Sequence, residues 1–433
     1  MNIVLCKGQF LGPISGADET LVTYAIQLQK LGHAVSVLLL YPCSPLDHHY
    51  QRLCEAGVPV AAVASNSVRK SLGAGRTVLP GLLDSFPSLR PLLRNRAQRI
   101  TTGLASRYLK QCGDSLRRLK ADIVHVVTPD SGSMVMIRAA HAAGIPVIYQ
   151  ELGIPYHPPD FEAYYEQFTT VLPLCSEIAA LSPLLAQHCQ AKLTHPHEFS
   201  VLPITTDDLR NGHQASRDLS TSVTVGFAAR IEHLKGPMIL LEAFARASQS
   251  CGELRLVIAG SGSQEQRVMA RARALGLASQ CEFVGVYTGP EQRKAFMERL
   301  DIFALPSFSE GTPNTIVEAM SHGVPTIASA VGGIPDLINA ETGILFPPGD
   351  EQALGEAIAR LAKDAGLRKK MGRAARQKYE QMFAPNVVLP LLLECYQRVI
   401  EGHGAGNNGA RHSPRSVSHP WSGVELLAAT RRG

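Results

Sequence analysis

Two glutamates, Glu310 and Glu318, stand eight positions apart in the segment of this sequence that offers the most chemistry. Glu318 interrupts an apolar run and shares one predicted helix face with Asn314 and His322, because positions spaced by four lie together on a helix. A carboxylate among apolar neighbours needs water or a hydrogen-bond partner, since an unpaired buried charge is costly. The hydroxyl groups of a sugar or a ribose are suitable partners, because a carboxylate can accept from two of them at once.

A predicted helix start beside Glu310 adds an anion-binding element. Thr312 followed by Pro313 predicts a capping hydroxyl and then a proline at the first helical position. The free backbone N–H groups of such a helix end attract anions. The segment therefore predicts hydroxyl binding beside anion binding. The alternative is an exposed Glu310 beside a cap and a Glu318 on a solvated helix face, and spacing alone does not decide between the two.

Two cations follow a predicted strand at 223–228. Arg230 and Lys235 lie five positions apart on the loop between this strand and a helix, at the sheet end where ligands of α/β proteins bind. They would neutralise a diphosphate leaving group, although many Lys and Arg side chains are only solvated. The sequence contains no Asp-x-Asp motif and no His or Cys cluster with ligand spacing. We therefore expect chemistry with no metal and no cofactor.

Small residues between Gly12 and Glu19, among them Gly16, stand between the first predicted strand and the first predicted helix. Such residues let the backbone approach a ligand closely, although any tight turn uses them too. The pattern Gly-x-Gly-x-x-Gly is absent there, which argues against an enzyme that uses nicotinamide or flavin.

Short apolar runs alternate with longer helical patterns along most of the chain, which indicates parallel sheets covered on both faces. The pattern begins at Met1 and begins again at Val223. The predicted strands include 2–6, 34–40, 122–127, 145–149, 223–228, 254–259, 301–305, 324–328 and 343–346. The predicted helices include 19–31, 238–248, 264–275, 291–299, 351–363 and 367–381. We predict an α/β fold with two doubly wound, Rossmann-like parallel-sheet domains that face a central cleft.

The same pattern divides the chain into segments. We expect an N-terminal domain at 1–210, a polar linker at 211–222, a C-terminal domain at 223–383, a final helix at 384–402 and a disordered tail at 403–433. The chain is 45% hydrophobic and 18% charged, which is typical of globular proteins. We find no uninterrupted apolar stretch of the roughly 18–20 residues that span a bilayer. Together with the scattered cysteines and a start that reads as a buried strand, this predicts a cytoplasmic protein.

Residues 61–120 are strongly basic. They hold twelve Lys or Arg against two acidic residues, so the segment is net +10 while the whole chain is net +5. Basic segments attract phosphates, nucleic acid or anionic lipid, and the leucines among these arginines would suit a membrane surface. The alternative, which we favour, is a helical segment with a solvated basic face. We expect no nucleic-acid partner. A lipid-linked or other anionic acceptor, met by peripheral contact at the inner face of the membrane, would suit the segment.

Together these motifs resemble the large GT-B-fold family of retaining glycosyltransferases that includes bacterial mannosyltransferases, sucrose synthases and sucrose-phosphate synthases. The resemblance covers 223–383, and its most specific part is Glu310-x7-Glu318 followed by Ala319-Met320, Gly323 and Pro325. Arg230, Lys235-Gly236, the stretch from Val257 to Gly262 and Val331-Gly332-Gly333 also match it.

The resemblance implies a role for each matching residue. Glu310 would bind hydroxyls of the donor sugar, and Glu318 would bind the ribose of the nucleotide. Arg230 and Lys235 would hold the diphosphate and stabilise its departure. Further donor contacts are implied for Gly16 and for Gly311, Thr312, Pro313, Asn314 and Thr315, with Phe283 and Val284 near the base. The final helix would cross back to pack on the N-terminal domain.

The N-terminal half departs from the family pattern. The strand ending at Tyr149 leads to Gln150-Glu151-Leu152-Gly153, with Leu152 where the family has a histidine that faces the reacting sugar. Glu151 or His157 would be candidates for the missing acceptor-side role. Equally, Glu151 would pair with a nearby arginine, and we leave both interpretations open.

The function expected from the sequence is metal-independent transfer of a sugar, with retention, from a nucleotide-diphosphate sugar to an unidentified acceptor. Two alternatives belong to other classes. One is a sugar-nucleotide epimerase on a similar scaffold, and the other is a catalytically silent relative that binds a nucleotide or a partner.

Overall fold

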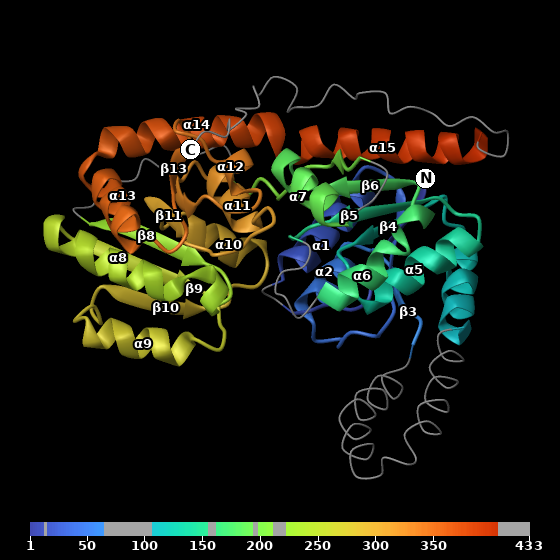
Figure 1. The fold of residues 1–433 in the computed structure, drawn as a ribbon, viewed down its shortest axis with the longest axis horizontal. Helices are drawn as coiled ribbons and strands as arrows, with labels where there is room; N and C mark the ends of the chain where they lie inside the picture. The colour runs from blue at the N-terminus through green and yellow to red at the C-terminus, as the bar shows by residue number, and fades with distance from the viewer. Residues whose placement is uncertain (13–14, 65–105, 155–161, 194–197, 211–221, 406–433) are drawn as a thin grey trace, which may run out of the picture.

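The computed structural model describes residues 1–12, 15–64, 106–154, 162–193, 198–210 and 222–405. His157, the greater part of the basic segment 61–120, nearly all of the predicted linker and most of the predicted tail lie outside these residues. The described residues form two parallel sheets, each covered by helices on both faces (Figure 1). The predicted α/β class with two Rossmann-like domains is confirmed.

The N-terminal sheet has the strand order β3-β2-β1-β4-β5-β6-β7, and all of its pairs are parallel. Its strands are β1 Asn2–Lys7, β2 Ala34–Leu39, β3 Val60–Ala62, β4 Ile123–Val127, β5 Val147–Glu151, β6 Glu177–Ala180 and β7 Ser200–Val201. Every residue of β4 and β5 is buried, as a strand covered on both faces requires. The strand order reverses direction between β1 and β4, and this is where doubly wound sheets place their ligands.

The C-terminal sheet repeats this arrangement with the order β10-β9-β8-β11-β12-β13. Its strands are β8 Val223–Ala228, β9 Leu254–Ala259, β10 Cys281–Gly285, β11 Ile302–Leu305, β12 Thr326–Ser329 and β13 Gly343–Phe346. The sequence prediction found every one of them except β10, and in the N-terminal sheet it did not name β3, β6 or β7. Both switch points, β1/β4 and β8/β11, precede loops that carry predicted site residues.

Helices join successive strands and cover the sheets. In the N-terminal domain they are α1 Gly16–Lys30, α2 His48–Glu55, α5 Ser131–Ala142, α6 Glu162–Thr169 and α7 Pro183–Leu193. In the C-terminal domain they are α8 Pro237–Ser250, α9 Glu265–Ala274, α10 Pro290–Met297, α11 Asn314–Ser321, α12 Ile334–Leu337, α13 Glu351–Lys363 and α14 Ala365–Met382. None of the helices in the described part of the chain is long and apolar enough to cross a membrane.

The last helix, α15 Pro385–Ala405, leaves the C-terminal domain and lies along the N-terminal one (Figure 1). Its apolar residues Leu389, Leu392 and Tyr396 join the core formed by β1, β2, α1 and α2. The Tyr396 hydroxyl is 2.7 Å from Nδ1 of His125 on β4, and both side chains are fully buried. Apolar burial and this hydrogen bond together fix the helix to the N-terminal domain.

Candidate functional site

The loop after β8 brings a lysine to Glu310. It passes through a short 3-10 turn, η4 His233–Lys235, and ends at Gly236, whose φ is 67°. A Cβ at Gly236 would lie 2.0 Å from the carbonyl oxygen of Pro306, so only glycine lets this loop approach the turn after β11. There the Lys235 Nζ lies 2.7 Å from the Glu310 Oε1, and the Ser307 hydroxyl donates to the same oxygen at 2.7 Å. The structure thus joins two motifs that lie 75 positions apart in the sequence.

Arg230, the other predicted cation, is exposed on this loop. The turn from Glu310 to Pro313 is largely buried, and Glu310 itself is 9% exposed. Gly311 accepts a hydrogen bond through its carbonyl from the Gly333 N–H at 2.8 Å. The carboxylate, the lysine and this turn therefore lie together at the carboxyl ends of β8 and β11.

Helix α11 begins one residue later than the sequence predicts. Pro313 occupies the N-cap with extended angles, φ −72° and ψ 124°, so Asn314 rather than Pro313 is the first helical residue. The expected capping role of Thr312 is wrong, because its hydroxyl makes no hydrogen bond within the described residues. The chain stays extended through Pro313, so the helix starts only after the proline. The shift leaves Asn314 and Thr315 in the first turn.

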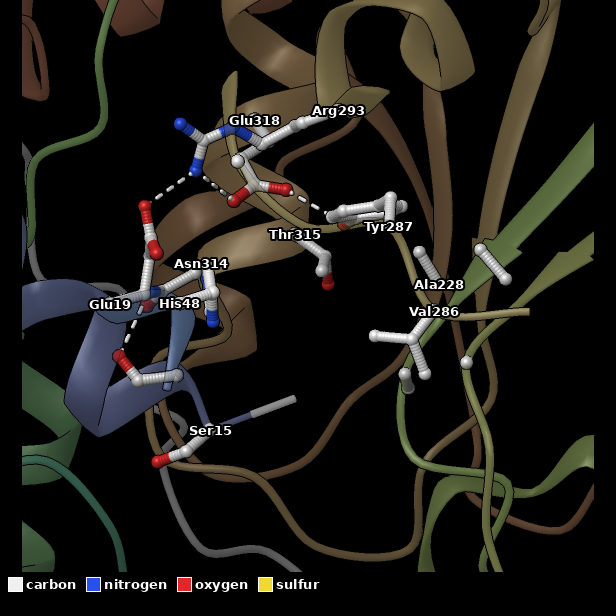
Figure 2. Close-up of a pocket in the computed structure, with 15 residues that line it drawn as sticks. Ser15, Glu19, His48, Ala228, Val286, Tyr287, Arg293, Asn314, Thr315 and Glu318 are labelled. Atoms are coloured by element: carbon white, nitrogen blue, oxygen red, sulfur yellow. Dashed lines mark hydrogen bonds and ion pairs between the residues drawn. The ribbon is translucent and has the colours of Figure 1, made fainter. Parts of the chain in front are cut away.

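A pocket lies between the two domains, and Figure 2 shows its side chains. It is lined by Ser15, Gly16, Glu19, His48, Ala228, Ala229, Ala259, Gly260, Val286, Tyr287, Gly289, Arg293, Asn314, Thr315 and Glu318. Four of the predicted donor-binding residues are among them: Gly16, Asn314, Thr315 and Glu318. Phe283 and Val284 are not. Gly285 has a φ of 69°, so the chain turns there, and the residues that follow β10, Val286 and Tyr287, form this wall instead.

Glu318 is 4% exposed and holds two partners (Figure 2). The Arg293 Nη1 lies 3.1 Å from its Oε1, and the Tyr287 hydroxyl donates to its Oε2 at 3.1 Å. Burial raises the pKa of Glu318, and the charge of Arg293 opposes that rise. The same burial, together with the Glu318 charge, raises the pKa of the Tyr287 hydroxyl, which therefore stays a donor.

Arg293 also reaches the N-terminal domain. Its Nη1 lies 2.8 Å from the Glu19 Oε1 on α1, and the Arg52 Nη1 on α2 lies 2.5 Å from the Glu19 Oε2. Burial alone would raise the pKa of Glu19, but Arg293 and Arg52 outweigh it and lower that pKa to about 2. Glu19 is therefore a charged group at neutral pH. One guanidinium thus bridges carboxylates of two domains.

A second contact between the domains uses backbone. Ser15 caps α1 by accepting from the Asp18 N–H, and the Asn314 Nδ2 donates to the carbonyl of Gly16 at 3.0 Å. The predicted small-residue turn after β1 therefore meets the first turn of α11. It faces the pocket that Glu318 lines.

Glu19, His48 and His49 could offer three ligand atoms to a metal, since these atoms lie within 4.8 Å of one another. Burial lowers the pKa of His48 to about 4, so its ring is neutral at neutral pH. Both oxygens of Glu19 are already held by arginines, however. The charges of Arg52 and Arg293 oppose a cation at this place, and we assign none.

Glu151 lies at the end of β5 and is 1% exposed. Its partners are the Tyr149 hydroxyl at 2.5 Å and the backbone N–H groups of Leu152 and Gly153, each at 3.0 Å. Of the two interpretations left open, pairing with an arginine is not seen among the described residues, where Tyr149 and the bend of the chain supply the donors instead. Burial outweighs these bonds and raises the pKa of Glu151 to about 7. By accepting from the Leu152 and Gly153 N–H groups, Glu151 fixes the conformation of the loop after β5.

That loop touches the donor-side turn. A Cβ at Gly311 would lie 2.1 Å from the carbonyl oxygen of Leu152 and 2.9 Å from the Cα of Gly153. The backbone of Leu152, where the family pattern has a histidine, thus packs directly on the residue after Glu310. The acceptor-side candidate His157 lies outside the described residues.

Residues 211–378 match the sequence profile of the family described as glycosyl transferases group 1. The C-terminal domain belongs to this family. A D-inositol 3-phosphate glycosyltransferase of Salinispora tropica is 31% identical over 189 residues, which are 41% of this chain and 39% of the relative. The amylovoran biosynthesis glycosyltransferase AmsK of Erwinia amylovora is 29% identical over 252 residues, 56% of this chain and 60% of the relative. The match thus spans about half the length of these curated relatives.

The fold of the whole chain is also that of solved glycosyltransferases. The crystal structure of Alr3699/HepE from Anabaena, in complex with UDP and glucose, superposes with a TM-score of 0.68 at 19% identity. The superposition covers 92% of this chain and 99% of the other. At this identity the likeness shows the GT-B fold alone.

Sequence reasoning missed three polar side chains that line the pocket together with Glu318. They are Tyr287 and Arg293 of the C-terminal domain and His48 of the N-terminal domain. One signal was available for Arg293. It shares a helix face with Phe296 and Met297, which are buried, so its position on a core-facing stripe marked it as a buried charge.

Proposed function

We propose that the protein transfers a sugar from a nucleotide-diphosphate sugar to an acceptor, with retention at the anomeric carbon and with no metal or cofactor. The observation that carries this proposal is the joint placement of Glu318 in an interdomain pocket and of the Lys235–Glu310 pair at the carboxyl ends of β8 and β11. Such a crevice is where doubly wound domains bind nucleotides. The UDP held by the similarly folded Anabaena protein supports a nucleoside-diphosphate sugar as the donor.

In this proposal the nucleoside lies in the pocket between Glu318 and the Val286–Tyr287 wall, with ribose hydroxyls donating to Glu318. The donor sugar lies toward Glu310. The diphosphate lies near Lys235 and the first turn of α11, whose free N–H groups favour an anion. Arg230 is exposed on the same loop and adds a second positive charge.

Charge stabilisation of the departing diphosphate is the main catalytic contribution in this scheme. Lys235 is 16% exposed, so its charge is only partly screened by water. Preorganised cations of this kind act where charge develops in the transition state. Glu310 and Glu318 position the donor, and neither has to form a covalent intermediate.

The acceptor would enter from the N-terminal domain, toward the loop after β5. We propose a cytoplasmic protein and a lipid-linked or other anionic acceptor that the positive charge of the basic segment 61–120 attracts. The charge of that segment supports this choice.

The test is thermal stabilisation of the full chain by UDP, GDP, ADP, TDP and the matching sugar nucleotides, with and without EDTA. A ligand that binds the native state raises the melting temperature by mass action. We expect a rise with one base that EDTA does not remove and that Glu318→Ala abolishes. The matched control is Glu356→Ala, because Glu356 is an exposed glutamate on α13. No rise with any nucleotide would overturn the proposal, and a rise lost in EDTA would overturn its metal-independent part.

A further inference from the structure

Arg293 is a buried cation at the boundary between the two domains. It is 3% exposed on α10, and its Nη1 lies within hydrogen-bond distance of both Glu318 and Glu19. The first carboxylate belongs to the C-terminal domain and the second to the N-terminal domain (Figure 2). A single guanidinium nitrogen therefore connects the wall expected to bind ribose with the opposite wall of the pocket.

Glu318 faces charged and titratable groups from every side of the pocket. Arg293 comes from α10 and Tyr287 from the segment after β10, while Glu19 comes from α1. Asp207 lies behind the arginine, with its Oδ2 3.8 Å from the Arg293 Nη2. Further out, Arg52 holds Glu19, and His48 lines the same pocket. Arg293 thus forms ion pairs with three carboxylates, those of Glu318, Glu19 and Asp207.

The charge state of Glu318 depends on this arginine. Burial disfavours the ionised carboxylate, and the negative charge of Glu19 disfavours it further. Arg293 opposes both effects through its charge and its hydrogen bond. Without the arginine, burial and Glu19 would together drive Glu318 toward its protonated form. A protonated carboxyl carries a hydrogen of its own, so it accepts fewer ribose hydroxyls than a carboxylate does.

Glu318 also has few free acceptor sites while Tyr287 and Arg293 hold it. Arg293 has two further donor nitrogens, Nε and Nη2, which have no hydrogen-bond partner among the described residues. The guanidinium could therefore turn toward Glu19 and Asp207 as hydroxyl groups take their place on Glu318. Its charge would remain close to the carboxylate throughout this exchange.

We propose that Arg293 is a positioning residue of the nucleotide site, which keeps Glu318 charged and oriented for the ribose hydroxyls while Glu19 anchors it from the other domain. This inference rests on the proposed function, because it assumes that a nucleotide binds at Glu318. It adds Arg293, which affects nucleotide binding through the Glu318 carboxylate. It also gives a route, through Glu19, by which the N-terminal domain affects donor affinity.

The experiment measures the affinity of the full chain for the tightest binder among UDP, GDP, ADP and TDP, by calorimetry between pH 5.5 and 8.5. In Arg293→Gln we expect weaker binding that falls by about tenfold for each pH unit below the raised pKa of Glu318 and recovers as the pH rises. The wild type and Arg293→Lys should show a flatter profile. Glu318→Gln should bind weakly at every pH, because its side chain does not titrate.

Glu19→Gln separates charge control from simple docking of the domains. It removes the negative charge on the N-terminal side of this contact and leaves Arg293 beside Glu318, with Asp207 3.8 Å from its Nη2, so we expect no steep fall at low pH. A steep fall in Glu19→Gln, or a flat profile in Arg293→Gln, would overturn the inference. Circular dichroism and the melting temperature of each variant identify any that fails to fold, and Arg293→Lys then carries the comparison through its wild-type-like profile.

The two proposals can fail separately. If the wild type binds none of the four nucleotides, the proposed function fails and the inference fails with it. If the wild type binds one and Arg293→Gln follows the wild-type pH profile, only the inference fails.

Discussion

Replacing Gly311, the residue after Glu310, by alanine would introduce a steric clash at the contact between the two domains. The new Cβ would lie 2.1 Å from the carbonyl oxygen of Leu152 and 2.9 Å from the Cα of Gly153. Both neighbours are backbone, so no side-chain rotation relieves the clash. The turn and the loop after β5 must separate by about 1.3 Å before the first contact, at 2.1 Å, reaches the ordinary 3.4 Å.

A displacement of that size matters for transfer more than for nucleotide binding. Catalysis needs reacting atoms within a few tenths of an ångström of their productive positions, and a misplacement of about 1 Å can cost on the order of 10²-fold in rate. Glu310 would move with Gly311 relative to the N-terminal domain. Glu318, Tyr287 and Arg293 lie elsewhere, on α11, after β10 and on α10, so the nucleotide should still bind.

The assay compares the turnover of sugar transfer with the affinity for the nucleoside diphosphate alone in Gly311→Ala. We expect a loss in kcat of about 10²-fold with affinity within about threefold of wild type, since only the domain contact is disturbed. Gly252→Ala is the matched control, because a Cβ at this exposed glycine meets nothing within 4 Å. Wild-type turnover in Gly311→Ala would refute the reasoning, and so would an equal loss of nucleotide affinity.

Three further changes test the lysine, the loop carboxylate and the final helix. Lys235→Ala should lower kcat by about 10²–10³-fold, the range for one preorganised charge, with little change in melting temperature. The exposed Lys369→Ala is its control, and near-wild-type turnover would remove Lys235 from the catalytic role. Burial raises the folded-state pKa of Glu151 from 4.5 to about 7, so the native state binds more protons in that window and the free energy of unfolding falls as pH rises through it, by roughly 2–3 kcal/mol. Urea titrations at pH 5 and pH 8 should show this fall in the wild type and not in Glu151→Gln, and an unchanged fall in the variant would assign it to other groups. Tyr396→Phe should cost about 1–3 kcal/mol in urea unfolding, because it leaves Nδ1 of the buried His125 unpaired, and wild-type stability would contradict that account.

The fold could be predicted well where apolar runs were long and continuous. The strands β1, β4, β8 and β9 are such runs, and their predicted bounds differ from the structure by at most one residue. The strands that escaped prediction lie at or next to sheet edges or are short. β3 has three residues and β7 has two, while β10 is an edge strand with only part of its surface buried. Edge strands need less apolar sequence, because water can cover one side of them.

For the site, too, the sequence predicted residues that are neighbours in the chain and missed those brought together from distant segments. Glu310, Glu318 and the start of α11 are neighbours in sequence, so their spacing alone placed them on one loop and one helix face. The start of α11 was one residue off, because the chain stays extended through Pro313. Val286 and Tyr287 replaced Phe283 and Val284 in the pocket wall, because a left-handed glycine at 285 turns the chain between the two pairs.

Contacts between domains could not be read from spacing, because they depend on how two folded units meet. Glu19 and Arg293 lie 274 positions apart, and Asn314 and Gly16 lie 298 apart. No local periodicity relates such positions. Two carboxylates, Glu19 and Glu318, face each other across this boundary and would repel if nothing stood between them. The bridge through Arg293 converts that repulsion into attraction, so one buried guanidinium both holds the domains together and sets the charge of the pocket. It follows that a change at Glu19, far in sequence from Glu318, should reach the donor site through this residue.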